Sequence, residues 1–324
     1  MKGKKLRIGI VGLGKMGLVH SGILNVLPNV ELAAVCEKNS MIRRFAKKLF
    51  RNLDIVDGLD KLEGFNLDAV YVTTPIPSHF PVAKAILESN ISRNLFVEKT
   101  LTQTYEEAMS LVDLAEFRQS INMVGYLRRF YVTFNKAKEL LREDAIGKPE
   151  SFQAYAYSSD FLGLEREIKA STSRGGVLRD LGCHAIDLAL WFFDDLTVKP
   201  DKTRINSQAG DLVNFKVEGS EIIGEFDVSW SKENYHLPEV GFSVTGSEGT
   251  LSVNDDQIRL VQLNGKSLQW YRHDLNDNVP FWLGLPEYYR EDLHFIKSLR
   301  GVTVANPDFR SAARVDKIVD EVIG

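Results

Sequence analysis

The chain has 324 residues, 44% of them hydrophobic, which is enough for about two domains with buried cores. Its net charge of −4 argues against a partner that is a nucleic acid or another polyanion. No apolar run approaches the roughly 20 residues of a membrane-spanning helix, so we expect no membrane partner. Two cysteines, Cys36 and Cys183, are too few for a disulfide framework or a zinc cluster, and we expect a cytoplasmic protein without a metal site.

The first predicted strand runs into a glycine-rich turn, Gly12-x-Gly14-x-x-Gly17, and a helix follows over about 18–27. The first glycine allows a tight turn, the second lets the backbone approach a pyrophosphate, and the third lets helix and strand pack closely. Phosphate oxygens would accept hydrogen bonds from free N–H groups at the helix N-terminus, such as those of Lys15 and Met16. The turn therefore predicts a dinucleotide site, although such turns are common and the motif alone is weak.

A short apolar strand over 31–36 ends at Glu37, about 20 residues past the glycine turn. A carboxylate at this place holds the two adenosine ribose hydroxyls and repels a 2′-phosphate, which favours NAD over NADP. Lys38, Arg43 and Arg44 follow closely and keep NADP as the alternative cofactor. The other interpretation of Glu37 is a solvated acid at a strand end.

Three more predicted strands, over 67–73, 94–97 and 121–124, alternate with predicted helices over about 40–50, 80–88 and 104–116. Continuous apolar strands of this kind are typical of a doubly wound parallel sheet, the Rossmann fold, whose ligands bind at the carboxyl ends of the strands. The residues at these ends are further candidates for the cofactor site: Thr73, Thr74, Pro75, His79 and Glu98. S-adenosylmethionine is the alternative ligand of such an edge.

From about residue 126 the pattern changes, and we expect a dinucleotide-binding domain over 1–125 and a substrate-binding domain over 126–324. After a helix over 134–142, a strand over 151–157 and a linker that includes Arg174, a helix covers 177–193. Predicted strands then follow at about 203–208, 211–217, 221–230, 240–245, 249–254, 257–263 and 267–272, and closing helices at 287–299 and 308–322. Consecutive strands without crossover helices indicate a large, mostly antiparallel open sheet, with the 177–193 helix on one face. An uncovered sheet face favours a homodimer or homotetramer.

The 177–193 helix carries Asp180, His184, Asp187 and Trp191 at a spacing that places them on one face. A carboxylate one turn from an imidazole orients the ring and raises its basicity, which suits a general base near neutral pH. Lys99, at a strand end over the expected nicotinamide site, can hold a substrate hydroxyl and lower its pKa. From the residues alone, a helix-terminal acid with an interface histidine and a solvated loop lysine remain open alternatives.

These motifs together resemble the Gfo/Idh/MocA family of pyridine-nucleotide-dependent oxidoreductases. The matching motifs come in the family's order and extend over the whole chain: Gly12-x-Gly14-x-x-Gly17, Ala34-Val35-Cys36-Glu37, Thr74-Pro75-x-x-x-His79, Glu98-Lys99, Gly125-Tyr126-x-Arg128-Arg129-Phe130, Ile146-Gly147-Lys148-Pro149 and Gly175-Gly176-x-x-x-Asp180-x-Gly182-x-His184-x-x-Asp187. Each motif is weak alone, and together they are highly specific.

The resemblance implies a Rossmann domain, an open-sheet α/β domain and an active site between them. It implies that Lys99, Asp180 and His184 form the catalytic set, as in inositol and sugar dehydrogenases. The reaction would then be hydride transfer between NAD(P) and a secondary alcohol of a polyol, sugar or sugar derivative. Arg128 is a candidate contact to substrate or cofactor, and an interdomain salt bridge is its alternative role.

Two positions depart from the family's pattern. Thr100 stands where the family has proline after Glu-Lys, which frees a backbone φ and adds an N–H, and Ile76 stands where asparagine is usual. Neither change removes a proton-transfer group. Two other functions remain as alternatives: a glycosidase-type enzyme that uses NAD as a redox shuttle, and a non-catalytic NAD(H)-binding protein.

Overall fold

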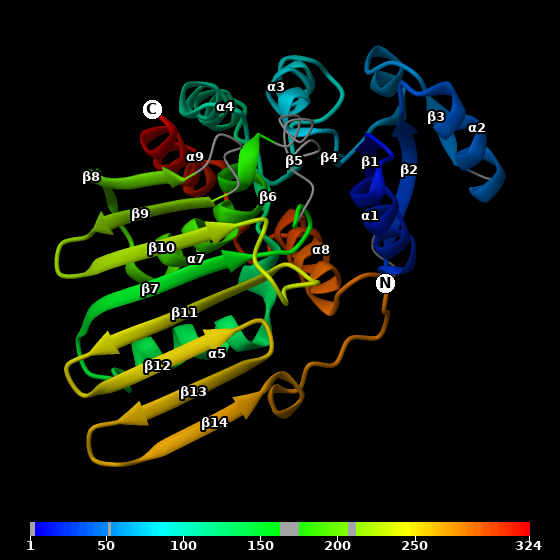
Figure 1. Cartoon of the computed structure of the whole chain (residues 1–324). Helices are drawn as coiled ribbons and strands as arrows, with labels where there is room; N and C mark the ends of the chain where they lie inside the picture. The colour runs from blue at the N-terminus through cyan, green and yellow to red at the C-terminus, as the bar shows by residue number, and fades with distance from the viewer. Residues whose placement is uncertain (1–3, 51–52, 163–174, 207–211) are drawn as a thin grey trace. The chain divides into compact units, whose positions relative to one another are not determined.

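The computed structural model describes residues 4–50, 53–162, 175–206 and 212–324 (Figure 1). The chain divides into two compact units: Met1–Gly125 with Val279–Ala313, and Tyr126–Asn278 with Arg314–Gly324. The first boundary lies after Gly125, where the sequence pattern changes. Residues 279–313, which the sequence assigns to the second domain, belong to the first unit because α8 (Pro286–Leu299) packs against α1 (Lys15–Val26).

The first unit contains a parallel sheet of six strands in the order β3-β2-β1-β4-β5-β6. The strands are β1 (Leu6–Val11), β2 (Val30–Cys36), β3 (Asp54–Val56), β4 (Ala69–Val72), β5 (Leu95–Glu98) and β6 (Asn122–Gly125). The remaining helices are α2 (Ser40–Leu49), α3 (His79–Glu88) and α4 (Tyr105–Phe117). This order confirms the predicted Rossmann fold, with its topological switch point between β1 and β4.

The core of the first unit includes the apolar central strands and α8. Tyr71 of β4 stacks on Phe96 of β5 with ring centroids 4.5 Å apart, and the Phe295 ring of α8 lies within 5.7 Å of both. All three side chains are fully buried. Both faces of the central strands are covered, and this explains their continuous rather than alternating apolar pattern.

The second unit contains an eight-stranded sheet in the order β14-β13-β12-β11-β7-β10-β9-β8. Its strands are β7 (Pro149–Tyr157), β8 (Thr197–Asn206), β9 (Leu212–Glu218), β10 (Ile223–Ser229), β11 (Glu239–Gly246), β12 (Gly249–Asn254), β13 (Gln257–Gln262) and β14 (Ser267–Tyr271). Every pair is antiparallel except β7–β10, so the sheet is mixed and mostly antiparallel, as expected. Parts of the predicted strands at 203–208 and 211–217, and Arg174, lie outside the described residues.

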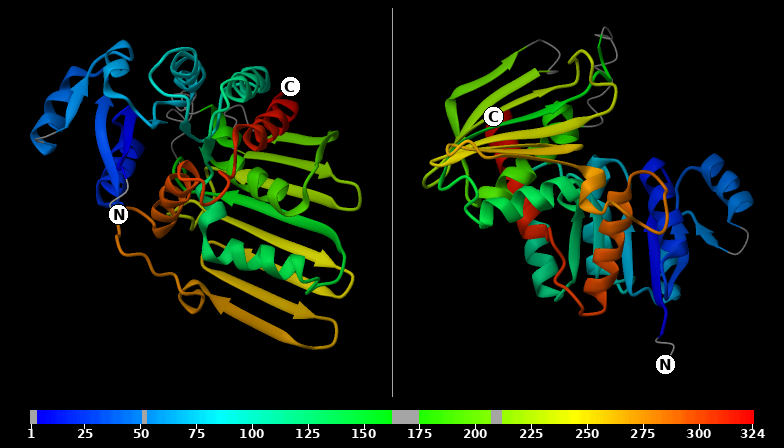
Figure 2. Two further views of the ribbon diagram at one scale, coloured as in Figure 1. Left: turned by 180° about the vertical axis from the view of Figure 1, so that it is seen from behind. Right: turned by 90° about the horizontal axis from the view of Figure 1, so that it is seen from below.

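One face of this sheet is covered by helices. The helix α7 (Cys183–Phe193) packs on β7 and β11, and α5 (Val132–Arg142) packs on β12 and β13 (Figure 2). Along β7, buried Phe152 and Ala154 alternate with the more exposed Gln153 and Tyr155, as the period of a strand with one covered face requires. The last helix, α9, spans Phe309–Ile323. None of the helices in the described part of the chain is long and apolar enough to cross a bilayer.

Candidate active site

The glycine turn joins β1 to α1, and two of its glycines are required because a Cβ at either position would clash with protein atoms. Gly12 has a φ of +94°, and a Cβ there would lie 3.0 Å from the Thr74 nitrogen. A Cβ on Gly17 would lie 2.1 Å from the Gly12 carbonyl oxygen, so α1 could not approach the turn. At Gly14, by contrast, a Cβ would meet nothing within 4 Å. The open space beside Gly14 is where a Cβ would obstruct a bound pyrophosphate.

The N-terminus of α1 suits an anion. Gly14 is its N-cap and offers no side-chain hydrogen bond, and the first turn, which is fully described, contains no acidic side chain. The first N–H groups of a helix, including those of Lys15 and Met16, have no partner within the helix. Together with the helix dipole they favour a phosphate, so the turn fits the pyrophosphate of a dinucleotide.

Glu37 follows β2 and is tied to the glycine turn. Its Oε2 accepts a hydrogen bond of 2.7 Å from the Leu13 N–H, and its Oε1 accepts one of 2.7 Å from the Asn39 N–H. The Arg43 guanidinium donates to the main-chain carbonyl oxygens of Glu37 and Lys38. Arg43 is therefore hydrogen-bonded to the main chain at the end of the strand. The Glu37 carboxylate lies where a ribose-binding acid is expected, which fits NAD better than NADP.

The end of β4 borders the same turn. The Thr73 hydroxyl donates to the Gly12 carbonyl oxygen at 2.6 Å, and the Thr73 N–H donates to that of Val11 at 2.9 Å. Pro75 precedes a short 3-10 helix, Ile76–Ser78, in which Ile76 is buried. The side chain at the position of the family's asparagine is therefore part of the apolar packing.

His79 braces two loops. Its Nδ1 lies 2.7 Å from the Thr100 carbonyl oxygen, and its Nε2 lies 2.8 Å from that of Thr74. The ring is buried, and burial lowers its pKa. Both ring nitrogens face backbone carbonyls, and the place of His79 in the cofactor site stays a prediction. The structure therefore places this histidine as a support between the loops that follow β4 and β5.

Lys99 directly follows β5, and its side chain is partly exposed. The peptide bond between Lys99 and Thr100 is cis. Thr100 is buried, and its hydroxyl donates to the Thr102 carbonyl oxygen at 3.2 Å. Lys99 thus stands at the carboxyl edge of the parallel sheet, as do the glycine turn and Thr73.

Glu98 has a partner that the sequence did not reveal. Its Oε1 lies 3.0 Å from the Nε2 of His20 on α1, while the Nδ1 of His20 lies 2.8 Å from Asp292 Oδ1 on α8. Burial lowers the pKa of His20, but Asp292 and Glu98 outweigh burial and hold it well above its ordinary value. Burial raises the pKa of Glu98, yet the hydrogen bond and charge of His20 reverse this and lower it.

These three residues, His20, Glu98 and Asp292, form the His20 cluster, which was not predicted from the sequence. The residues stand 78 and 272 positions apart in the sequence, so only the tertiary fold brings them together. A histidine on an apolar helix face gave no signal of its own. Among the described residues, no group of His, Cys, Asp and Glu has the arrangement of a metal site.

Asp180 and His184 lie in the second unit, and their helix differs from the expected one. Leu178–Gly182 forms a π-helical turn in which the Cys183 N–H donates to the Leu178 carbonyl oxygen, and α7 begins only at Cys183. The α-helical spacing therefore does not describe Asp180, because a π turn is wider. Such turns recur at functional sites. Asp180 is partly exposed, whereas His184 is 7% exposed, with its ring edge against Tyr126 at a centroid distance of 6.3 Å.

The other two residues of the expected helix face anchor the fold. Asp187 is fully buried and accepts two hydrogen bonds from Arg129, of 2.8 and 2.7 Å. Burial raises the pKa of Asp187, and the Arg129 charge opposes this shift. The Arg129 guanidinium also lies 5.7 Å from the Trp191 ring centroid. Asp187 thus forms a buried ion pair with Arg129.

Arg128 is likewise held inside the second unit. It is 4% exposed, and its guanidinium donates to Asp255 at 3.2 and 3.1 Å and to the Pro238 carbonyl oxygen at 3.0 Å. We expected a ligand contact or an interdomain salt bridge. These bonds join Arg128 to the segment before β11 and the turn after β12, within one unit, and its role toward a ligand or the other unit stays a prediction.

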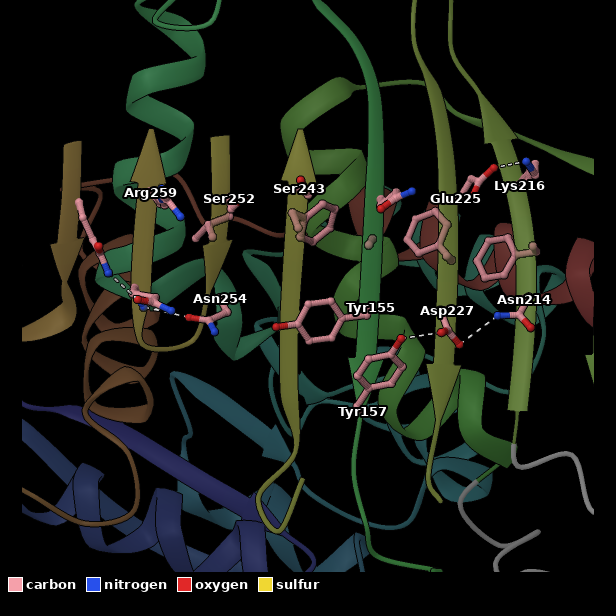
Figure 3. Close-up of a pocket in the computed structure, with 18 residues that line it drawn as sticks. Tyr155, Tyr157, Asn214, Lys216, Glu225, Asp227, Ser243, Ser252, Asn254 and Arg259 are labelled. Atoms are coloured by element: carbon pink, nitrogen blue, oxygen red, sulfur yellow. Dashed lines mark hydrogen bonds and ion pairs between the residues drawn. The ribbon is translucent and has the colours of Figure 1, made fainter. Parts of the chain in front are cut away.

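The face of the large sheet opposite α5 and α7 carries a polar hollow of about 1060 Å³ (Figure 3). Tyr155 and Tyr157 stack in it with ring centroids 4.8 Å apart. The Tyr157 hydroxyl and the Asn214 amide both donate to Asp227 (Figure 3). The hollow is lined mostly by polar and charged side chains, together with apolar residues such as Phe226 and Phe242.

Two family models match the chain. A model described as an oxidoreductase family with an NAD-binding Rossmann fold matches residues 6–126. A second model, the GFO/IDH/MocA C-terminal domain, matches residues 134–252. The first match covers the glycine turn, Glu37 and Lys99, and the second covers Asp180 and His184.

Known proteins of similar sequence include two inositol dehydrogenases. The chain is 24% identical to inositol 2-dehydrogenase of Rubrobacter xylanophilus over 266 residues, or 77% of this chain and 72% of that protein. It is 26% identical to scyllo-inositol 2-dehydrogenase (NAD(+)) of Bacillus subtilis over 280 residues, or 81% and 79%. Its fold is similar to that of a levoglucosan dehydrogenase in complex with NADH and L-sorbose, with a TM-score of 0.86, 19% identity and coverage of 99% and 96%.

Proposed function

The chain belongs to the Gfo/Idh/MocA family of NAD-binding oxidoreductases, and we propose that it transfers a hydride between NAD and a secondary alcohol of a sugar, polyol or sugar derivative. The proposal rests above all on Lys99, a charged group at the sheet edge where the glycine turn and Glu37 fit the dinucleotide. The named activities of the two inositol dehydrogenases and of the levoglucosan dehydrogenase agree with this substrate class.

The cofactor contributes a nicotinamide ring that takes up or returns the hydride. His184 takes the proton of the substrate hydroxyl, and the hydride leaves the carbon that carries this hydroxyl, so the alcohol becomes a carbonyl. Asp180 orients the imidazole and stabilises its cationic form. The Lys99 ammonium binds the reacting oxygen and stabilises the negative charge that develops on it.

Several observations support these roles. His184 is buried in the first turn of α7, with its ring against Tyr126, so the position of the imidazole is fixed by packing. Asp180 lies in a π turn immediately before α7, a position typical of functional residues. Glu98 and His79 hold the loop around Lys99 from two sides.

The roles are tested by the turnover of His184→Ala and Lys99→Ala with NAD and a panel of polyols, aldoses and nucleotide sugars. Removal of a positioned acid–base group lowers turnover by about 10²–10⁴-fold, whereas NADH binding, followed by fluorescence, should be retained. His273→Ala, at an exposed position, is the control. Wild-type turnover in either active-site variant would refute the assigned roles.

The same assay separates the alternatives. Product formation without net NADH would indicate the glycosidase-type redox shuttle. NADH binding without any product would indicate a non-catalytic NAD(H)-binding protein.

A further inference from the structure

We propose that His20 is a positioning residue that fixes the Lys99 loop through Glu98. This inference rests on the proposed role of Lys99. It assigns a function to a buried histidine that lies on a different helix and is not itself expected to touch substrate or cofactor.

The hydrogen bonds form one continuous series. Asp292 Oδ1 lies 2.8 Å from His20 Nδ1, and His20 Nε2 lies 3.0 Å from Glu98 Oε1. The other carboxylate oxygen of Glu98, Oε2, accepts the backbone N–H of Lys99 at 3.1 Å. Each oxygen of Glu98 thus has a donor of its own, and the orientation of its carboxylate is fixed by His20 on one side and by Lys99 on the other.

The packing leaves this series little freedom. The His20 ring is fully buried among Tyr71, Phe96 and Tyr288, with centroid distances of 5.4, 5.1 and 6.1 Å. A Cβ added to Gly125 would lie 3.3 Å from Glu98 Oε2, so β6 also confines the carboxylate. Hydrogen bonds to charged groups are strengthened where water is excluded.

The charges explain why a histidine serves here. An imidazolium has two N–H donors in opposite directions and can satisfy a carboxylate at each end. The raised pKa of His20 and the lowered pKa of Glu98 agree with a cation beside an anion. Without the imidazolium, Glu98 would be a buried carboxylate short of one donor and would rotate or take up a proton. Either change alters the acceptor that holds the Lys99 N–H.

A purely structural cluster, which only joins α1 to α8, is the competing explanation. Two substitutions distinguish the two because glutamine and asparagine keep different halves of the imidazole. The amide nitrogen of His20→Gln reproduces Nε2 and can still donate to Glu98. The amide nitrogen of His20→Asn reproduces Nδ1 and can donate only to Asp292. Both variants lose the charge, and asparagine, which is one methylene shorter than glutamine, leaves the larger space in the core.

Positioning through Glu98 predicts unequal effects on turnover. His20→Asn should lower kcat by about 10–100-fold, since small displacements of a catalytic group have effects of this size. His20→Gln should recover most of that loss, and the Kd of NADH should change little in either variant. Thermal unfolding of both variants checks that they are folded. Equal losses in the two variants, or wild-type kcat in His20→Asn, would overturn the proposal.

A readout without substrate separates this inference from the proposed function. In the wild-type protein, labelled with ¹⁵N-lysine and assigned through Lys99→Arg, the Lys99 amide proton should resonate downfield because a carboxylate accepts it. The resonance should move upfield in His20→Asn and stay near its wild-type position in His20→Gln. If the resonance behaves so while Lys99→Ala retains full turnover, the positioning holds and the catalytic role of Lys99 fails. An unmoved resonance in His20→Asn contradicts the positioning itself.

Discussion

Glu37 is bound to the glycine turn, and we expect it also to hold the ribose of the cofactor. Its carboxylate already accepts the N–H groups of Leu13 and Asn39, so its position is fixed before any ligand binds. Hydrogen bonds to charged groups contribute about 1.5–3 kcal/mol each. We therefore expect Glu37→Ala to raise the Kd of NAD about 10–100-fold and to reduce the preference over NADP. Fluorescence titration with NADH and NADPH measures both, and an unchanged ratio of the two Kd values would argue against a ribose contact.

His20 makes stability depend on pH in a direction that its environment determines. Its folded-state pKa is raised well above the ordinary value because Asp292 and Glu98 outweigh burial. Below the unfolded-state pKa, both states are protonated and the stabilisation is complete; it is lost as pH rises through the folded-state pKa. The free energy of unfolding by urea should therefore fall more steeply above neutral pH in the wild type than in His20→Gln. Parallel pH profiles would contradict a buried imidazolium.

Within the glycine turn, we expect Gly17 to be needed for folding and Gly14 for binding of the cofactor. Gly14→Ala meets no protein atom within 4 Å, whereas Gly17→Ala places a Cβ 2.1 Å from the Gly12 carbonyl oxygen. We expect Gly14→Ala to keep the wild-type melting temperature but to weaken NAD binding, because the methyl group enters the pyrophosphate space. Gly17→Ala should lower both the melting temperature and the affinity. Calorimetry with and without NAD checks this pair, and tight NAD binding by Gly14→Ala would place the pyrophosphate elsewhere.

The sequence predicted those elements whose pattern is local. Continuous apolar strands and the glycine turn indicated the parallel sheet, and alternation along strands such as β7 indicated the open one. The strand β3 was not predicted because Ile55 is its only buried residue, so it has no apolar run. The π turn was not predicted because the i, i+4 spacing of Asp180 and His184 also fits an ordinary α-helix. Partners such as Asp292 and Asp255 were missed because long-range contacts leave no local signal.

For the whole molecule, the chain order was a poor guide to the units. The closing helix α8 belongs to the first unit and supplies Asp292 to the His20 cluster. A single domain boundary along the sequence does not describe a chain whose residues 279–313 return to the first unit. The reason is physical: the apolar residues of α8, such as Phe295, complete the core around Tyr71 and Phe96, and helical periodicity does not say which core a helix joins.

The sheet face opposite α5 and α7 gives a prediction for the assembly. We expect a second copy of the chain to cover the hollow around Tyr155 and Tyr157, because hydrogen-bonded polar groups of this kind are common in interfaces. Ser243→Arg, which places a long charged side chain in the hollow, should then shift the protein to monomers. Light scattering coupled to size exclusion measures the mass. A wild-type monomer, or an unchanged oligomer in the variant, would contradict this interface.

The proposed reaction is direct hydride transfer between a secondary alcohol and NAD. It is tested most directly with a substrate from the panel that carries deuterium on the carbinol carbon, followed by mass spectrometry of the reduced cofactor. We expect the deuterium to appear in the NADH, in proportion to the ketone product, and this transfer to be lost in Lys99→Ala and His184→Ala. Deuterium that stays in the sugar product, or is released to water while product forms, would contradict it.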